Sequence, residues 1–177
     1  IQQFVDRMFL SWHSEEALAA AMPAGILNFA FICLFIGTVS YAGTFVSQYV
    51  GAKEDHKVGK VLWHSFYLSL FGAMILLLVS PFSSELFRIV GHSSKLQIME
   101  STYFKILCFG GLGPILSSAF AGFFTGQGRN WPVMWVNIFT TTINLILDYL
   151  LICGIGIFPE MGIAGAALAT IIAGFSS

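Results

Sequence analysis

Long stretches without a charged side chain make up most of this sequence. Residues 17–52 form 36 uncharged residues in a row, and uncharged runs of 24, 23 and 18 residues follow at 61–84, 106–128 and 130–147. A helix crosses the hydrocarbon core of a bilayer with about 17–25 predominantly apolar residues. Each run is long enough to span, so the chain is predicted to be an all-α polytopic membrane protein.

Charged and turn-forming residues divide the chain into six expected helices. A partial helix ends at about residue 12, and others cover about 17–50, 57–80, 97–125 and 130–154, with a sixth from about 162. The first stretch is too short to span and the last is at the lower limit, so both ends are interpreted as edges of a longer membrane protein. No linker divides residues 1–177, which we interpret as one domain. Pro23 and Pro114 lie inside expected helices and are candidate hinges.

Composition argues against several classes of function. Only 10% of the residues are charged, against about 25% in a typical soluble domain. The net charge of −1 offers no basic face for nucleic acid. The sequence contains no glycine-rich phosphate loop, serine nucleophile motif or paired-histidine metal motif. We therefore expect no enzyme, no cofactor and no metal site apart from a possible Na⁺ site.

Basic residues in the short connections indicate an orientation in the membrane. Cytoplasmic loops are enriched in Lys and Arg. The loops after the second and fourth helices carry four basic residues, Lys53, Lys57, Lys60 and Arg129. The opposite side carries Arg88, Lys95 and Lys105, diluted by acidic residues that include Glu16, Glu85 and Glu100. This bias places the second-to-third and fourth-to-fifth loops in the cytoplasm.

Asp148 lies in the middle of an otherwise apolar segment. A carboxylate at the centre of a bilayer costs at least about 2.5–3.5 kcal/mol, so such residues usually face an internal cavity and serve a function. Asn144 lies one helical turn earlier, and Asn137 and the hydroxyls of residues 140–142 extend the polar stripe. The stripe indicates either a site for a small cation or a hydrogen-bonded contact between helices.

Asp6 is the second carboxylate within an expected membrane helix. If Asp6 faces Asp148 across a cavity, the like charges disfavour simultaneous ionisation, and the pair binds a proton or Na⁺ more readily than either acid alone. The alternative is that Asp6 lies at a water-exposed helix end. Arg7 follows directly, but neighbours on a helix point about 100° apart and need not pair.

Several motifs resemble those of the multidrug and toxic compound extrusion (MATE) family. They are Val5-Asp6 followed by residues 17–21, the segment 48–52 (Gln-Tyr-Val-Gly-Ala), residues 126–129 (Gly-Gln-Gly-Arg), Asn144-x-x-x-Asp148-Tyr149, and residues 162–170, which end in Ala-Leu-Ala-Thr. Their order and spacing extend over nearly the whole chain. Arg7 is a departure from the pattern and leaves the local charge balance open.

The resemblance implies a fold of twelve helices in two six-helix lobes with a cavity between them. This chain then covers the amino-terminal lobe, with its first and sixth helices truncated. The resemblance also implies a cation site made by Asp6, Asn144, Asp148 and Thr170. Thr170 is matched through its Gly-Ala-Ala-x-Ala-Thr context, because the loop at 154–160 is long for the family.

The function implied by the resemblance is secondary active multidrug efflux. An organic, often cationic, compound is exchanged for H⁺ or Na⁺ by a multi-pass protein of the bacterial inner membrane, whose other partners are membrane lipid and the second lobe. One alternative is a lipid-linked oligosaccharide flippase of the same superfamily, which needs more Arg or Lys facing the cavity than Arg7 and Lys105. The other is a membrane receptor or scaffold, which needs no carboxylate inside the membrane.

Overall fold

The computed structural model describes residues 2–154 and 161–177, and the side chains of all of these except residues 2–5, 13 and 153. Over this part of the chain the backbone forms α-helices and one 3₁₀ turn and contains no strand. The helices are α1 (Gln2–His13), α2 (Glu15–Ser40), α3 (Ala42–Gly51), α4 (Asp55–Val79), α5 (Ser83–Val90), α6 (Ser94–Phe109), α7 (Leu112–Gly126), α8 (Asn130–Cys153) and α9 (Gly162–Phe175). The all-α prediction is confirmed.

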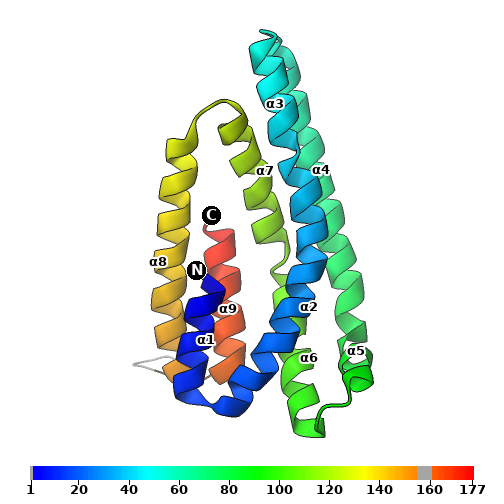
Figure 1. Cartoon of the computed structure of the whole chain (residues 1–177), viewed down its shortest axis with the longest axis vertical. Helices are drawn as coiled ribbons and strands as arrows, with labels where there is room; N and C mark the ends of the chain where they lie inside the picture. The colour runs from blue at the N-terminus through cyan, green and yellow to red at the C-terminus, as the bar shows by residue number, and fades with distance from the viewer. Residues whose placement is uncertain (1, 155–160) are drawn as a thin grey trace.

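The helices run roughly along one long axis (Figure 1). The α3–α4 and α7–α8 connections lie at one end of the molecule, and the α1–α2 and α5–α6 connections lie at the other. Helices α1, α8 and α9 pack against one another, and α9 also contacts α6 and α7. This packing brings the start of the chain next to segments more than 130 residues later.

Most expected helices appear at the expected places. The segment expected at 17–50 is the consecutive pair α2 and α3, interrupted only at Tyr41, and the segment expected at 130–154 is α8. Helix α2 begins where Ser14 caps it, because the Ser14 side chain accepts a hydrogen bond from the Ala17 amide. The start of the sixth helix at Gly162 is also as expected. Residues 155–160 of the preceding loop lie outside the described residues.

The helix expected at 57–80 is longer than the sequence indicated. Helix α4 continues through a 3₁₀ turn at Ser80–Phe82 into α5, which ends at Gly91 with a positive φ of 79°. Pro81 removes one backbone donor, and the backbone tightens there without leaving the helical direction. Phe87 of α5 packs edge-on against Phe104 of α6, with ring centroids 5.8 Å apart. This buried contact lies in a segment that the sequence analysis left between two expected helices.

The helix expected at 97–125 is broken into α6 and α7, which meet at a bend of 42°. The break falls at Gly110 and Gly111, and Pro114 lies in the first turn of α7. A proline in a first turn loses little, because the amides there have no intrahelical acceptor. The glycines allow close packing, since a Cβ on Gly110 would lie 2.2 Å from Ile171 of α9. The kink expected near Pro114 is therefore present, just before the proline.

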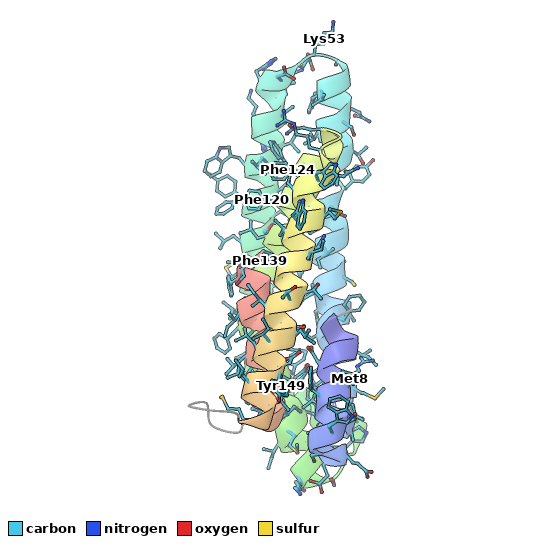
Figure 2. The ribbon with its side chains drawn as sticks, turned by 90° about the vertical axis from the view of Figure 1, so that its left-hand side faces the viewer. Met8, Lys53, Phe120, Phe124, Phe139 and Tyr149 are labelled. Atoms are coloured by element: carbon cyan, nitrogen blue, oxygen red, sulfur yellow. The ribbon has the colours of Figure 1, made fainter. Side chains whose placement is uncertain are left out.

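Three helical stretches are long and apolar enough to cross a membrane: Glu15–Gly51, Asp55–Val90 and Asn130–Ile152. The bent pair of α6 and α7 makes a fourth if it counts as one span. Large apolar side chains point outward along these helices, as Figure 2 shows for Phe139 and Tyr149 of α8, which are 59% and 52% exposed. A lipid-facing surface accounts for this exposure.

Glu100 is not the exposed loop charge that the orientation argument assumed. Its side chain is completely buried on α6, and Nδ1 of His92 lies 2.7 Å from its Oε1. Lys95 and Glu16 form an ion pair between the starts of α6 and α2. Of the acidic residues counted at this end, Glu100 is therefore buried, whereas Glu16 and Glu85 are exposed and form ion pairs with Lys95 and Arg88.

Candidate functional site

Asp6 of α1 is at the centre of a buried polar cluster. Its side chain is 2% exposed. Oδ1 accepts a hydrogen bond from Nδ2 of Asn144 on α8 at 3.3 Å, and Oδ2 accepts one from Oγ1 of Thr170 on α9 at 3.0 Å. The expectation that Asp6 lies at a water-exposed helix end is therefore wrong. Three helices separated by up to 164 residues meet at this one carboxylate.

Asp148 lies one turn beyond Asn144 and is completely buried. Its carboxyl group faces that of Asp6, close enough for the two groups to interact directly. Three oxygen atoms of the cluster, both carboxyl oxygens of Asp148 and Oδ1 of Asn144, accept no hydrogen bond from any described residue. An isolated buried carboxylate without donors is strongly unfavourable. The cluster is thus rich in acceptor oxygens and poor in protons.

Thr170 has two acceptors for one hydroxyl proton. Its Oγ1 lies 3.0 Å from Oδ2 of Asp6 and 3.0 Å from the carbonyl oxygen of Ala166 in its own helix. A hydroxyl has a single proton to donate and lone pairs with which to accept. Thr170 can therefore donate to Asp6, or donate to Ala166 and present its oxygen to the cluster.

The spacing of the polar residues on α8 explains their burial. Thr140, Asn144 and Asp148 recur every four residues, which places them on one helix face, and all three are buried. Asn137 and Thr142 were expected to extend this stripe, but both are exposed. Thr142 lies on another face and donates to the carbonyl of Ile138. Asn137 lines a groove together with residues of α7 and α8, among them Phe120 and Val133.

Helices α8 and α9 approach closely because small residues line the contact. A Cβ on Gly165 would lie 2.6 Å from the carbonyl oxygen of Leu151, and the amide of Met161 donates to that oxygen at 3.0 Å. Helix α9 buries mainly glycine and alanine. The close approach places Thr170 of α9 in the same cluster as Asn144 of α8, and its short side chain contacts Asp6 of α1.

A cavity of about 240 Å³ opens beside the cluster. Asp6 and Thr170 form part of its wall, whereas Asn144 and Asp148 are not among the residues that line it. The rest of the wall is mainly apolar and comes from α2, α6, α7 and α9, and it includes Phe29, Ile32, Ile36, Leu107 and Pro114. Asp6 and Thr170 thus belong both to the buried cluster and to the cavity.

Arg7 is the lining residue whose place the sequence did not determine. Its half-buried side chain contributes to the wall next to Asp6. The sequence left open whether Arg7 pairs with Asp6 because adjacent helical residues diverge by about 100°. In the structure Asp6 and Arg7 both line the cavity.

The candidate hinges differ in their surroundings. Pro114 contributes to the cavity wall directly after the break between α6 and α7. Pro23 lies inside α2, and the helix continues through it. Among the described residues, no three His, Cys, Asp or Glu side chains group as they do around a transition metal. Oxygen atoms from carboxylate, amide and hydroxyl groups dominate the cluster, and these are the ligands of hard cations.

The fold and the cluster together define a polytopic helical membrane protein with ionisable groups held inside its bundle. A model of the MatE family matches residues 1–150, and the chain belongs to this family of multidrug and toxic compound extrusion transporters. The resemblance read from the motifs is thereby confirmed. Members of this family are transporters and not enzymes.

Curated relatives agree with this membership. The chain is 28% identical over 171 residues to the probable multidrug resistance protein NorM of Thermotoga maritima, covering 96% of this chain and 37% of that protein. It is 30% identical over 165 residues to the probable multidrug resistance protein YoeA of Bacillus subtilis, covering 91% of this chain and 35% of YoeA. The chain thus spans little more than a third of the length of these relatives.

Solved structures show the same fold. The inward-facing conformation of a multidrug resistance MATE family transporter matches with a TM-score of 0.90 and 23% identity, covering 99% of this chain and 39% of that one. The outward-facing conformation of such a transporter matches with a TM-score of 0.88 and 23% identity, covering 98% and 38%. The helix arrangement is therefore that of one part of a MATE transporter.

Proposed function

We propose that this chain is the amino-terminal lobe of a secondary active transporter that exports organic compounds in exchange for H⁺ or Na⁺. The observation that carries the proposal is that Asp6 and Thr170 line the cavity and also contact the buried cluster. A ligand in the cavity and a cation in the cluster then act on the same carboxylate. Residues 1–177 form this lobe, and a second lobe completes the transporter.

In this proposal Asp6, Asn144, Asp148 and Thr170 form the cation site. Asp148 and Asn144 supply oxygens without donors, and Asp6 faces Asp148. A proton shared between the two carboxyl groups removes one buried negative charge and creates the missing donor. A Na⁺ ion neutralises the same charge and uses the amide and hydroxyl oxygens as further ligands.

Exchange follows if the cation and the exported compound compete. A positively charged compound in the cavity is attracted to ionised Asp6, and a proton or Na⁺ at the cluster weakens that attraction. The coupling ion must also bind the inward-open and outward-open states with different affinity, because equal binding shifts no equilibrium. Bending at Pro23 and at Pro114 changes the hydration of the cluster and supplies this difference.

The membrane context of the proposal is the bacterial inner membrane. The curated relatives are bacterial proteins, and the apolar outer surface of the helices fits contact with lipid. A flippase for lipid-linked oligosaccharides is a weaker candidate, because Arg7 is the one basic residue among the described residues that line the cavity. A receptor or scaffold is also a weaker candidate, because such a function does not require a pair of carboxyl groups buried inside the membrane.

The decisive experiment replaces Asp148 with Asn in the complete protein that carries this chain. The amide keeps the size of the carboxyl group but neither ionises nor accepts a shared proton. The measured quantity is the efflux of ethidium from proteoliposomes under an imposed H⁺ or Na⁺ gradient. We expect its rate to fall roughly tenfold or more, which lies within the usual range for the coupling between two binding sites. The amount of protein in the membrane should stay the same.

Asp55→Asn is the matched control. Asp55 lies exposed in the first turn of α4, at the end of the molecule far from the cluster. This variant should retain gradient-driven efflux. Undiminished efflux in Asp148→Asn, with normal membrane insertion, would contradict the cation site.

A further inference from the structure

Arg7 places a fixed positive charge on the wall of a mainly apolar cavity. A guanidinium group stays ionised at every physiological pH, and its transfer away from water is unfavourable without an anionic partner. The remaining lining residues that can ionise are Asp6 and Tyr103. Asp6 is therefore the carboxylate that lines the cavity beside Arg7, and a compound in the cavity can supply a second anionic partner.

Asp6 is already engaged by other donors. Its Oδ1 accepts from Asn144 and its Oδ2 accepts from Thr170, both on the side of the buried cluster. The ion pairs among the described side chains link Lys57 with Glu54, Arg88 with Glu85, His92 with Glu100 and Lys95 with Glu16. Within these residues no carboxylate lies at ion-pair distance from the guanidinium of Arg7, and Arg7 is one of the residues that line the cavity.

We propose that Arg7 selects compounds that carry an acidic group, a carboxylate above all, on an aromatic or aliphatic body. The planar guanidinium binds a carboxylate through two parallel hydrogen bonds. Phe29, Ile32 and Leu107 offer an apolar wall for the body of the compound. This inference rests on the proposed transport function and specifies the substrate class of the same cavity.

The neighbouring Asp6 determines how the coupling ion acts on such a compound. A proton or Na⁺ on the carboxylates makes the wall more positive, so an acid at Arg7 is held more tightly and a cation more weakly. Competition with the coupling ion therefore requires a positive group as well. The compounds that suit both neighbours carry an acidic group for Arg7 and a positive group near Asp6.

Equilibrium dialysis on the complete protein in detergent micelles, with no ion gradient, tests the role of Arg7. The probes share a naphthalene ring and differ in their head groups: 1-naphthaleneacetate, its methyl ester, and 1-naphthylmethylammonium. In Arg7→Gln we expect the acetate to bind about tenfold more weakly, because a charge-assisted pair of hydrogen bonds is lost. The ester should bind with unchanged affinity, and the ammonium probe should bind more tightly.

Two further variants complete the test. Arg7→Lys keeps the positive charge but loses the planar guanidinium that can donate two parallel hydrogen bonds. Its affinity for the acetate should therefore fall between those of wild type and Arg7→Gln. Arg88→Gln removes an exposed guanidinium from α5 and should leave all three affinities unchanged. Unchanged acetate binding in Arg7→Gln overturns the inference, and so does an equal loss of all three probes, which indicates a structural role.

Failure of the transport proposal gives a different result. If Asp148→Asn retains ion-driven efflux while Arg7→Gln loses only acetate binding, the cation site is wrong and the assignment of Arg7 stands. If Arg7→Gln does not fold, the comparison of acetate with ester in Arg7→Lys decides, because equal affinity ratios in Arg7→Lys and wild type contradict a bidentate contact.

Discussion

Thr170 is the residue at which the choice between a proton and Na⁺ is made in the proposed site. Its hydroxyl lies equally far, at 3.0 Å, from Oδ2 of Asp6 and from the carbonyl of Ala166. While Asp6 is ionised, the hydroxyl proton stabilises the carboxylate. When Na⁺ binds, the proton can turn to Ala166, and the hydroxyl oxygen becomes a ligand.

We predict that Thr170→Ala weakens Na⁺ coupling more than H⁺ coupling. A Na⁺ ion needs several oxygen ligands, whereas a proton needs only one or two acceptors. The concentration of Na⁺ that gives half-maximal efflux should rise roughly tenfold, as expected for a lost contact to a charged group. The rate driven by a pH gradient should change about twofold or less, because Asp6 and Asp148 both remain.

Thr142→Ala is the control for this prediction. Thr142 is exposed on α8 and donates to the carbonyl of Ile138 in its own helix, so it has the same local bond without the contact to Asp6. Both gradients should drive efflux normally in this variant. An equal loss under Na⁺ and H⁺ gradients in Thr170→Ala would count against a ligand role for the hydroxyl.

At the scale of elements, the contact between α8 and α9 determines the geometry of the cluster. Gly165 lies against the carbonyl of Leu151, and a Cβ at that position would come within 2.6 Å of the oxygen. Because the obstacle is backbone, one helix has to move to make room. Asn144 and Asp148 on α8 would then shift relative to Thr170 on α9.

We therefore predict that Gly165→Ala destabilises the protein by about 1–3 kcal/mol, the usual cost of overpacking. The midpoint of thermal unfolding of the complete protein in detergent measures the effect. Gly37→Ala provides the comparison, because no atom lies within 4 Å of its added Cβ. Alanine at such an open helical site should be neutral or stabilising by about 0.5–1 kcal/mol. A smaller loss at Gly165 than at Gly37 would contradict the close-packing argument.

Helices could be predicted from the sequence where composition and periodicity agree. They were predicted less well where contacts between distant residues determine the structure. Helix α8 was predictable because its uncharged run is long enough to span a membrane, and because Asn144 and Asp148 lie one helical turn apart on the same face. Helix α5 was missed because it has only eight residues and follows Pro81, and its packing of Phe87 against Phe104 of α6 is not visible in the local sequence. The burial of Glu100 was also missed, because its partner His92 precedes α6 and the contact between them is not visible in the local sequence pattern.

The candidate site shows the same division. The four residues were selected by motif and by the cost of charge in a membrane, but their mutual geometry depends on helices that are far apart in sequence. The distinct role of Asp6, which faces both the cluster and the cavity, required the packing of α1 against α8 and α9. No local pattern specifies that Arg7 joins it on the cavity wall.

At the scale of the whole molecule, the loops divide between two ends in the way that a multi-pass protein requires. Lys53 lies at the tip of one end (Figure 2), and the α7–α8 connection, which contains Arg129, lies toward the same end but short of that tip (Figure 1). The other end carries Glu16 paired with Lys95 and the turn at Gly91. The basic residues at the first end predict that it faces the cytoplasm.

Labelling of single cysteines tests this orientation. In a cysteine-free variant of the complete protein, in which Cys33, Cys108 and Cys153 of this chain are among the residues replaced, a membrane-impermeant maleimide should label Lys53→Cys only in inside-out vesicles. It should label Ser93→Cys only in right-side-out vesicles, since Ser93 is exposed at the opposite end. The reverse pattern would show that the charge bias does not determine the orientation.

The sequence separation within the cluster has a consequence for how the protein is made. Asp6 is 138 residues from Asn144 and 164 residues from Thr170. At a synthesis rate of roughly 5–20 residues per second, the first helix exists for on the order of ten seconds before either partner has been translated. During that interval Arg7, the next residue in the chain, is a countercharge close to this carboxylate. The guanidinium that later lines the cavity can therefore help the first helix to enter the bilayer before the rest of the bundle has been translated.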